Sequence, residues 1–296
     1  MSQSRVAASR GVRTGVPSGT ALACADWQAF SGPGGRWVRS IERMESEAEA
    51  RVTAAISRVT RGETFSDVSP AWVRFLQENM PVAAFAFNEC GRLLQALSLR
   101  SPWGGLSDGL ALQASMQHRQ AQAIVLYIAD MEQRLDTLPM PTARTRWRTD
   151  RSWLPTHHFL EQATTSPDWG EALVAINLCF EPLAGQLLRR EFAMRLGPAH
   201  GDQVTGIVAE TGQDEWALIR TWTAHLITFL VQDEEHGEEN QALLQTWVAR
   251  QLPAAEQAAR ALAGLVRDLD SHAAGSVARV VEDQRAFLGE VGLVAA

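Results

Sequence analysis

The stretch QDEEHGEEN, residues 232–240, concentrates side chains that can bind a metal ion. It places His236 among five carboxylates, and Asp233 lies three residues before the histidine. Residues three apart share one face of a helix, so this pair could bind one ion, and carboxylate and imidazole both suit iron. The competing interpretation is a solvated turn, in which Gly237 is a left-handed helix cap and the next two glutamates fall in the first turn of the following helix. We favour the turn, because no other part of the sequence completes a metal site.

The other ligands of a carboxylate-bridged metal pair are missing at the expected spacing. Such a pair needs a glutamate from each of two helices and a Glu-x-x-His motif from each of two more. The nearest matches are Gln117-x-x-Gln120 and Glu215-x-x-Leu218. Amides are weak iron ligands without charge, and leucine offers no ligand atom. His118 points away from the face that Gln117 and Gln120 share.

Three further carboxylates do not repair this loss. Glu89 and Glu181 could each point from a helix toward the core, yet both also suit structural roles. Glu181 precedes Pro182 and could accept hydrogen bonds from backbone donors at a kink. Asp233 lies 18 residues, about five helical turns, beyond Glu215, which places it at another level of a bundle. The sequence therefore predicts no metal-binding, cofactor-binding or catalytic residue in this chain.

Composition excludes several other classes of function. All 27 basic residues are arginine, so the lysine of a phosphate-binding loop is missing. A net charge of −7 disfavours nucleic acid, and the three scattered cysteines favour a reducing compartment. No apolar run approaches the roughly 20 residues of a membrane span. The adjacent His157 and His158 would point about 100° apart in a helix, so we interpret them as surface or packing residues. We expect a cytoplasmic protein that binds neither nucleic acid nor membrane.

Apolar residues recur at helical spacing from residue 40 onward, and no segment shows convincing strand alternation. The sequence therefore predicts an all-α fold with a single helical domain over residues 40–296. Residues 1–39 are punctuated by glycine, serine, arginine and proline and predict an extended arm, whose Trp27, Phe30 and Trp37 could dock onto another surface. Segments longer than the average helix of about 11 to 12 residues favour a long-helix bundle.

Several of the predicted helices have recognisable ends and faces. Ser69 and a following proline cap and begin a helix that Pro81 should kink. A later helix presents a broad apolar stripe from Gln117 to Leu135. The segment 168–196 is apolar nearly all round, which predicts the centre of the bundle. The predicted helices cover residues 40–59, 69–97, 107–135, 146–163, 168–196, about 203–230 and, as two or more helices, 238–291, with a linker near 138–146.

Residues 176–205, INLCFEPLAGQLLRREFAMRLGPAHGDQVT, resemble the beta subunit of the hydroxylase component of soluble bacterial multicomponent monooxygenases. This family includes the methane, phenol/toluene, alkene and propane enzymes. The resemblance covers nearly the whole chain outside the arm. Supporting stretches are VSPAWVRFLQENMP at 68–81, MQHRQAQAIVLYIADM at 116–131, SPDWGEALVAINL at 166–178 and RTWTAHLITFLVQDEEHGEENQALLQTWV at 220–248.

The resemblance implies a ferritin-like, ribonucleotide reductase-like bundle that is homologous to the catalytic alpha subunit but lacks its iron ligands. Gln117, Gln120, Glu215 and Leu218 would then occupy vestigial ligand positions. It also implies an (αβ)2 or (αβγ)2 hydroxylase, in which a di-iron centre in alpha oxidises a small alkene, alkane or aromatic hydrocarbon with O2 and electrons derived from NAD(P)H. A reductase and a coupling protein would act on this complex. The beta chain would scaffold alpha, with its arm wrapped around the partner, and would have no active site of its own.

Two alternatives stay open at this point. A self-contained di-iron oxidase would use unrecognised ligands such as Glu89, Glu181, Glu215 and His118, and would consume oxygen by itself. An unrelated helical binding module would form a stable monomer that ignores any alpha subunit. The neighbouring reading frame would discriminate, because a chain with two Glu-x-x-His motifs there would indicate the beta-subunit role.

Overall fold

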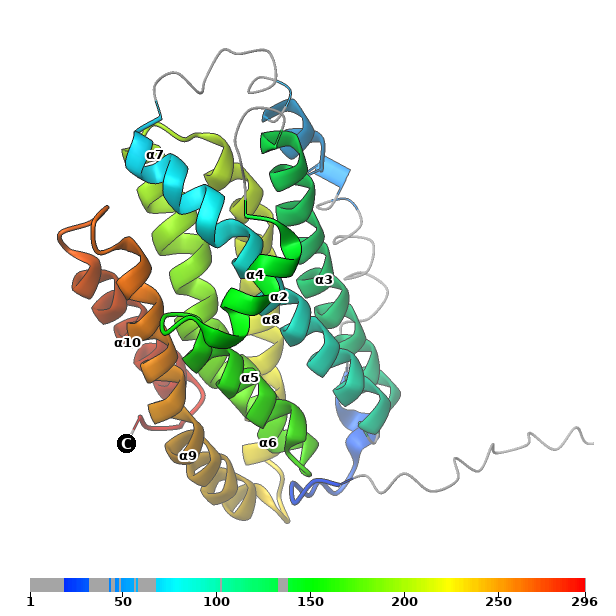
Figure 1. The fold of residues 1–296 in the computed structure, drawn as a ribbon. Helices are drawn as coiled ribbons and strands as arrows, with labels where there is room; N and C mark the ends of the chain where they lie inside the picture. The colour runs from blue at the N-terminus through cyan, green and yellow to red at the C-terminus, as the bar shows by residue number, and fades with distance from the viewer. Residues whose placement is uncertain are drawn as a thin grey trace, which may run out of the picture.

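The computed structural model describes residues 19–31, 43, 46–47, 49–55, 57, 68–101, 103–132 and 138–295. Helices are the regular elements of these residues and no strand occurs among them, so the predicted all-α class is confirmed (Figure 1). The described residues between 43 and 57 are helical. The other elements are η1 Trp27–Ala29, α2 Pro70–Arg100, α3 Gly104–Met131, α4 Met140–Thr149, α5 Leu154–Thr165, α6 Trp169–Val174, η2 Ala175–Gly185, η3 Leu187–Leu196, α7 Gly197–Ala199, α8 Val204–Val231, α9 Gly237–Ala263, η4 Gly264–Val266 and α10 Ala273–Glu290.

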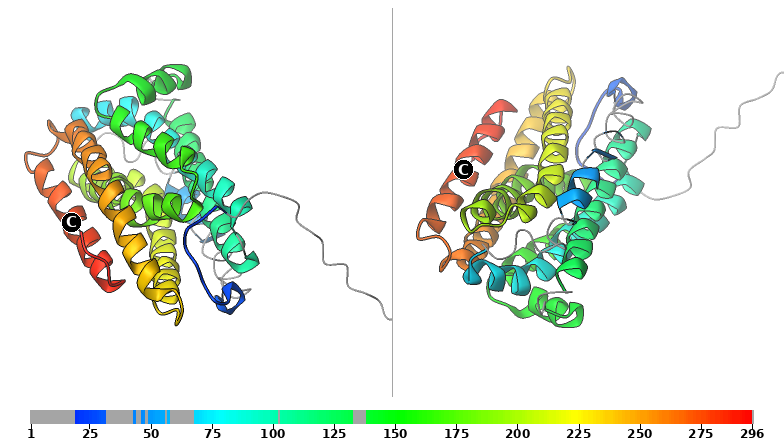
Figure 2. Two further views of the ribbon diagram at one scale, coloured as in Figure 1. Left: turned by 90° about the horizontal axis from the view of Figure 1, so that it is seen from below. Right: turned by 90° about the horizontal axis from the view of Figure 1, so that it is seen from above.

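The elements α6, η2, η3 and α7 form one continuous helix, Trp169–Ala199, which we name the central helix (Figures 1 and 2). Asp168 caps its start by accepting from the next turn's N–H groups, and η2 and η3 have the wider π-helical turns. Nearly all of its residues up to 193 are buried, so its predicted place at the bundle centre is confirmed. Among the described helices it alone is long and apolar enough to cross a membrane, yet its apolar stretch is wholly buried in the protein.

Helices α2 and α3 pack side by side (Figure 1). Ser69 caps α2 as predicted, because its side chain accepts from the Trp72 N–H at 3.3 Å. Pro81 lies inside α2 and has no N–H, so it leaves the Gln77 carbonyl without its helical donor. The Leu138 N–H donates to that carbonyl at 3.0 Å. A bond from another segment therefore replaces the one that the proline removes.

The segment from 138 to 165 differs from the prediction of a linker followed by one helix. The structure has two helices, α4 and α5, with a break after α4 at Asp150. The Asp150 side chain accepts from the Ser152 N–H at 2.8 Å, and its carbonyl accepts from the Trp153 N–H at 3.0 Å. Such local bonds between side chain and backbone interrupt a helix without changing its apolar periodicity. The periodic pattern alone therefore joined two helices into one.

Residues 19–31 lie against the helices of their own chain (Figure 2). Phe30 is 2% exposed and contacts the rings of Trp222 and Phe229 on α8. The Asn240 side chain bonds both the N–H and the carbonyl of Ala23, at 3.1 and 2.8 Å. This part of the predicted arm therefore docks onto its own bundle, where we had expected it to reach a partner. The rest of residues 1–39, including Trp37, lies outside the described residues.

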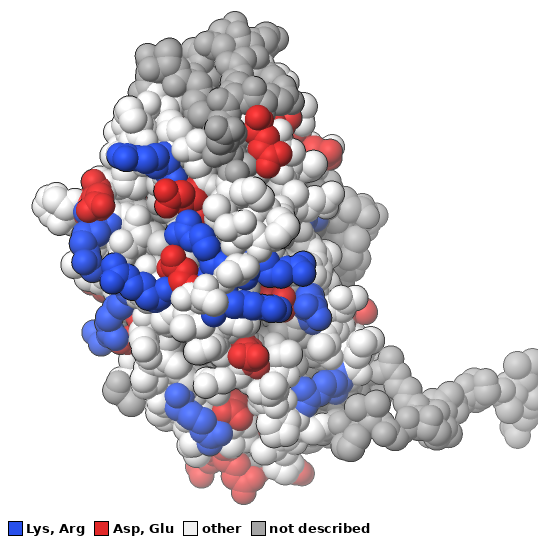
Figure 3. All heavy atoms as spheres, in the orientation of Figure 1, with Lys and Arg blue, Asp and Glu red and all other residues white. Residues whose placement is uncertain are grey.

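Arginines and carboxylates lie next to one another on the face that Figure 3 shows. Among the ion pairs of the described residues, Arg146 of α4 pairs with Asp150 at 3.2 Å and with Glu78 of α2 at 3.6 Å. Such pairs neutralise charge locally and link neighbouring helices.

Candidate functional site

Three helices bring the predicted ligand positions to the centre of the bundle. Helix α3 supplies Gln117 and Gln120, the central helix supplies Glu181, and α8 supplies Glu215. These four side chains belong to residues that are at most 8% exposed. Leu218, three residues beyond Glu215, is partly buried and packs against the hydrophobic core. The structure thus gathers these positions, and it adds a residue that we had not predicted, Arg189.

Glu181 and Arg189 form an ion pair that is sealed from solvent. The Glu181 side chain is fully buried, the Arg189 side chain is 1% exposed, and Arg189 Nη2 donates to Glu181 Oε2. The guanidinium also lies over the Phe87 ring, 5.5 Å from its centre, in a cation–π contact. Removing such charges from water costs several kcal/mol per ion, so a buried pair is sustained only by close contact and further hydrogen bonds.

The two glutamines of α3 supply those further hydrogen bonds. Gln117 Nε2 donates to Glu181 Oε1 at 2.8 Å, and Arg189 Nη1 donates to Gln120 Oε1 at 3.2 Å. A side-chain amide can both donate and accept a hydrogen bond. Gln117 therefore donates to the Glu181 carboxylate, and Gln120, three residues later, accepts from the Arg189 guanidinium. The Gln-x-x-Gln pair thus solvates an ion pair without adding charge to it.

The surroundings of Glu181 correct one prediction. The Glu181 carboxylate bonds side chains, where we had predicted backbone donors near Pro182. At that proline, the Leu178 carbonyl, which in an α-helix would accept from residue 182, accepts from Gln284 Nε2 of α10 at 3.1 Å. Cys90 Sγ of α2 lies 4.0 Å from Glu181 Oε1. Burial, and to a smaller extent the nearby Glu181 charge, raises the pKa of this thiol well above its usual value. Cys90 is therefore a neutral thiol.

Glu215 is neutralised by a second arginine. Arg119 of α3 bonds its carboxylate, and the Glu215 side chain is 5% exposed against 30% for Arg119. Both residues line a surface pocket of about 540 Å³ between α3, α8 and residues 49–53 and 57. This pair therefore borders on solvent, whereas the Glu181–Arg189 pair does not.

Two glycines leave room for the cluster. A methyl group on Gly185 would lie 2.6 Å from Glu181 Oε2 and 2.9 Å from Arg189 Nη2. A methyl group on Gly212 of α8 would lie 2.6 Å from Gln120 Oε1. Any larger residue at either position would push apart the polar contacts described above.

The remaining candidate ligands point elsewhere. Glu89 pairs with Arg92 at 3.3 Å, and its side chain is 34% exposed. His118 lies against Gly91 of α2, where an added methyl group would come within 2.9 Å of the imidazole. The structure therefore does not bring Glu89 and His118 together with the buried carboxylates.

Residues 232–236 of the stretch QDEEHGEEN form a turn between α8 and α9, as we predicted, and residues 237–240 begin α9. The Asp233 carboxylate accepts from the N–H groups of Ala25, Glu235 and His236 at 2.9, 3.0 and 2.9 Å. These bonds, led by the one from Ala25, lower the pKa of Asp233 to about 2. Asp233 thus fastens the amino-terminal segment to the turn.

Gly237, which follows this turn, is not a left-handed cap, which corrects the prediction. Among the described residues the left-handed conformation occurs at Gly201 and Gly292. Gly237 instead opens α9, and a methyl group on it would lie 2.5 Å from the Val231 carbonyl oxygen. The glycine is needed for close approach, and the two glutamates that follow lie in the first turn of α9 as predicted.

A second buried polar set lies earlier along α3. Gln113 and Asn177 exchange two amide bonds of 2.6 and 3.2 Å, and Asn177 Nδ2 donates to Thr223 Oγ1 of α8 at 2.9 Å. All three residues are at most 1% exposed. Our sequence reasoning missed this set, although Gln113, Gln117 and Gln120 recur at i, i+4 and i+7 and predict a polar stripe on an apolar face.

Residues 9–234 match the family described as Methane/Phenol/Alkene Hydroxylase. The chain belongs to this hydroxylase family. Among its relatives are hydroxylase component small subunits of propane 2-monooxygenase. The one from Rhodococcus jostii RHA1 is 29% identical over 244 residues, which cover 82% of this chain and 66% of that subunit. The one from Mycolicibacterium smegmatis is 28% identical over 221 residues, covering 74% and 60%. The chain thus spans less than two thirds of the length of these relatives.

Two solved structures of hydroxylases share the fold. The xenon-pressurised phenol hydroxylase from Pseudomonas sp. OX1 superposes with a TM-score of 0.76 at 17% identity, over 93% of this chain and 81% of that one. Toluene 4-monooxygenase with bound toluene gives a TM-score of 0.76 at 17% identity, over 84% and 81%. The fold is therefore the ferritin-like helical bundle of the hydroxylase subunits, as the resemblance implied.

A carboxylate-bridged iron pair, which bundles of this kind commonly hold, does not fit the residues of this hydroxylase-family chain. Such a pair needs four carboxylates and two histidines. At the predicted ligand positions the buried carboxylates are Glu181 and Glu215, and each is already paired with an arginine. The Arg189 guanidinium would repel a dication at this place. Within the described part of the chain, no group of three or more His, Cys, Asp or Glu residues is arranged to hold a metal ion.

Proposed function

We propose that this chain is the non-catalytic small, or beta, subunit of the hydroxylase of a multicomponent hydrocarbon monooxygenase. Membership of the hydroxylase family and the relatives named as propane 2-monooxygenase small subunits support this role. The single observation that carries the non-catalytic part is the buried Arg189–Glu181 pair, which fills the centre of the bundle with a fixed cation. The chain contributes a stable helical surface, and the chemistry belongs to its partner.

In this proposal the partner is a large, or alpha, subunit that holds a di-iron centre and oxidises a small hydrocarbon with O2. The two subunits assemble as (αβ)2, or as (αβγ)2 where a gamma subunit is present. A reductase delivers electrons from NAD(P)H and a coupling protein acts on the complex, all in the cytoplasm. The propane relatives favour a short alkane, and an alkene is the next candidate.

Co-expression with the neighbouring reading frame that carries two Glu-x-x-His motifs tests the proposal. We expect the two chains to co-purify in equal amounts, with the iron in the complex and none bound stoichiometrically by this chain alone. About two iron ions per isolated chain, or oxygen uptake by it, would instead indicate a self-contained oxidase. A monomer that ignores the partner would indicate a binding module.

A matched pair of variants sharpens this test. Glu215→Gln in this chain should leave the turnover of the assembled complex unchanged, because no reacting group contacts Glu215 in the proposed role. The same change at a glutamate of the partner's Glu-x-x-His motifs should abolish turnover. Loss of turnover in correctly assembled Glu215→Gln complex would contradict the non-catalytic role.

A further inference from the structure

We infer that the centre of this bundle is a site for a guanidinium-type cation, and that the Arg189 side chain is its built-in occupant. The cation neutralises Glu181 where a long-helix bundle of this kind can otherwise hold metal. The inference rests on the geometry of the core and stands independently of the proposed function.

Charge is matched one to one at this site. Glu181 has three described side-chain partners, namely Arg189, Gln117 and Cys90, and Arg189 alone among them is charged. Burial keeps the Cys90 thiol neutral by raising its pKa, so it adds no second negative charge. The site therefore balances one monovalent cation, and a dication would leave a net positive charge in the core.

Shape selects guanidinium over other monovalent cations. Arg189 Nη2 donates to Glu181, Nη1 donates to Gln120, and the face of the group lies over Phe87 at 5.5 Å. A planar guanidinium can donate along its edge to a carboxylate and to an amide oxygen while its face lies against an aromatic ring. A compact ammonium group cannot make these three contacts at once. Gly185 leaves the space that the Nη2 edge occupies.

A small cation from solvent could reach the site that the Arg189 guanidinium occupies. A cavity of about 30 Å³ lies beside Arg189, with Phe75 and Phe87 in its wall. Gln120 and Val208 line both this cavity and the surface pocket of about 540 Å³. Truncation of Arg189 would enlarge this cavity toward Glu181, and the wall that it shares with the surface pocket, Gln120 and Val208, is where a small ion could enter.

The experiment is chemical rescue of Arg189→Ala in the full chain, followed by thermal unfolding. The variant leaves Glu181 buried without a counter-charge, so we expect its Tm to fall by roughly 10 °C. Added guanidinium chloride should raise that Tm in a saturable manner. Urea has the same planar shape without charge, and at about 20 mM neither compound denatures appreciably, since both act over molar concentrations. Urea and sodium chloride should therefore give no rescue.

Two further variants keep the inference testable if Arg189→Ala does not fold. Arg189→Met should be less stable than the neutral double variant Glu181→Gln/Arg189→Met, which needs no cation and should not respond to guanidinium. The matched control is Arg190→Met, because Arg190 is adjacent on the helix but 33% exposed. The Tm of this control should change little, and guanidinium should not raise it.

Equal responses of Arg189→Ala to guanidinium and urea, or an Arg189→Met variant as stable as the double variant, would overturn the inference. Either result would leave co-purification with an alpha subunit, and hence the proposed function, unaffected.

Discussion

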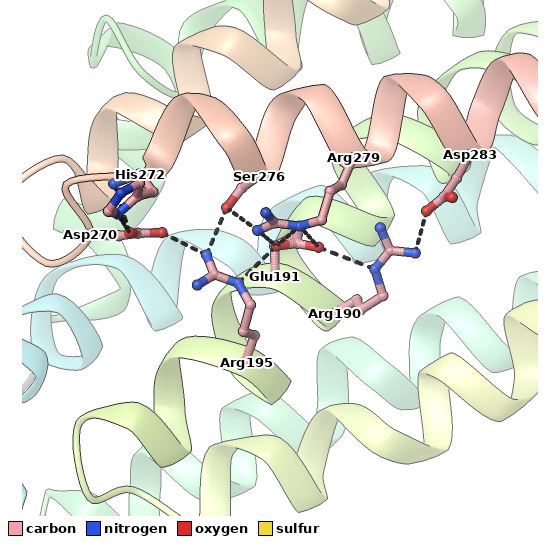
Figure 4. Close-up of polar contacts among 8 residues, drawn as sticks. All are labelled: Arg190, Glu191, Arg195, Asp270, His272, Ser276, Arg279 and Asp283. Carbon is pink, nitrogen blue, oxygen red and sulfur yellow. Dashed lines mark hydrogen bonds and ion pairs between the residues drawn. The ribbon is translucent and has the colours of Figure 1, made fainter.

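Glu181 and Glu191 are two buried carboxylates on the central helix, and the chain neutralises them in opposite ways. Glu181 has one arginine and neutral partners in the core, sealed from bulk solvent. Glu191 has three arginines around it (Figure 4): Arg279 of α10 at 2.5 Å, Arg195 at 2.9 Å and Arg190 at 3.3 Å. The side chains of these arginines are 33 to 46% exposed, so the cluster around Glu191 is in contact with solvent.

The cluster around Glu191 continues outward as a clamp. Arg195 also bonds Asp270 at 2.6 Å, and Arg190 bonds Asp283 of α10 at 2.5 Å. Ser276 accepts from Arg195 and Arg279 at 2.7 and 3.1 Å (Figure 4). Three arginines thus face three carboxylates, and the network joins η3 to α10 and to the loop before it.

The two clusters differ in whether solvent can hydrate a charged side chain whose ion-pair partner has been removed. In the outer cluster water can hydrate an arginine that loses its carboxylate, so the remaining bonds rearrange at modest cost. In the core both side chains are sealed from bulk solvent, so a charge that loses its partner stays buried without a counter-charge. The inner pair is therefore fragile to single substitutions, and the outer network is tolerant of them.

The same substitution at the two carboxylates tests this most strongly. Glu181→Gln should destabilise the fold by about 3 to 5 kcal/mol, because it leaves the Arg189 charge buried alone. Urea-induced unfolding at neutral pH measures the change. A loss no larger than that of Glu191→Gln would break the comparison.

Gly185→Ala should have the next largest effect, about 1 to 3 kcal/mol of destabilisation. The added methyl group would lie 2.6 Å from Glu181 Oε2 and 2.9 Å from Arg189 Nη2, and neither side chain can move away into solvent. Gly289→Ala on α10 is the matched control, since a methyl group there meets no atom within 4 Å. Alanine should stabilise that helix by a few tenths of a kcal/mol to about 1 kcal/mol. Equal signs for the two variants in thermal unfolding would contradict the close packing inferred at Gly185.

Glu191→Gln should cost about 1 to 2 kcal/mol at neutral pH, because the arginines that lose charge-assisted bonds can hydrate. Burial raises the pKa of Glu191, but the hydrogen bonds from Arg279 and Arg195 lower it more, and the net shift is downward. The ionised carboxylate thus stabilises the fold above the ordinary glutamate pKa of about 4.3, and this contribution is lost as the pH falls below it. Unfolding of both proteins across pH 3 to 7 should show their difference shrinking toward acid; a constant difference would refute this assignment.

Asp233→Asn should have the smallest effect on global stability and a clear local one. The exposed carboxylate holds the Ala25 N–H, and its pKa of about 2 lies below the ordinary value near 3.9. This contribution is present above pH 3.9 and is lost as the pH falls toward 2. Hydrogen exchange at residues 19–31 should accelerate in the variant while exchange in the central helix stays as it was. Unchanged exchange at Ala25 would show that the other contacts of the segment, among them those of Asn240 and Phe30, hold it without the Asp233 carboxylate.

The sequence predicted the helical class, the burial of residues 168–196 and the inward face of Gln117 and Gln120, because each depends on periodicity within one segment. It did not predict the role of Arg189, which is defined by partners on another helix and by a glycine one turn away. The helix break at Asp150 and the conformation of Gly237 were not predicted either, for a related reason. Both depend on local backbone hydrogen bonds or close contacts that apolar spacing does not encode.

The apolar length of the central helix has a consequence for biosynthesis. As the chain leaves the ribosome, this segment resembles a membrane span before α8, α9 and α10 exist to cover it. A charged side chain at the centre of a membrane span opposes insertion into the bilayer by roughly 2.5 to 3.5 kcal/mol. Glu181 lies near the middle of this helix, and Arg189 lies about two turns beyond Glu181. Arg189, together with Glu181 and Glu191, therefore biases the nascent helix toward its own bundle and away from the translocation machinery.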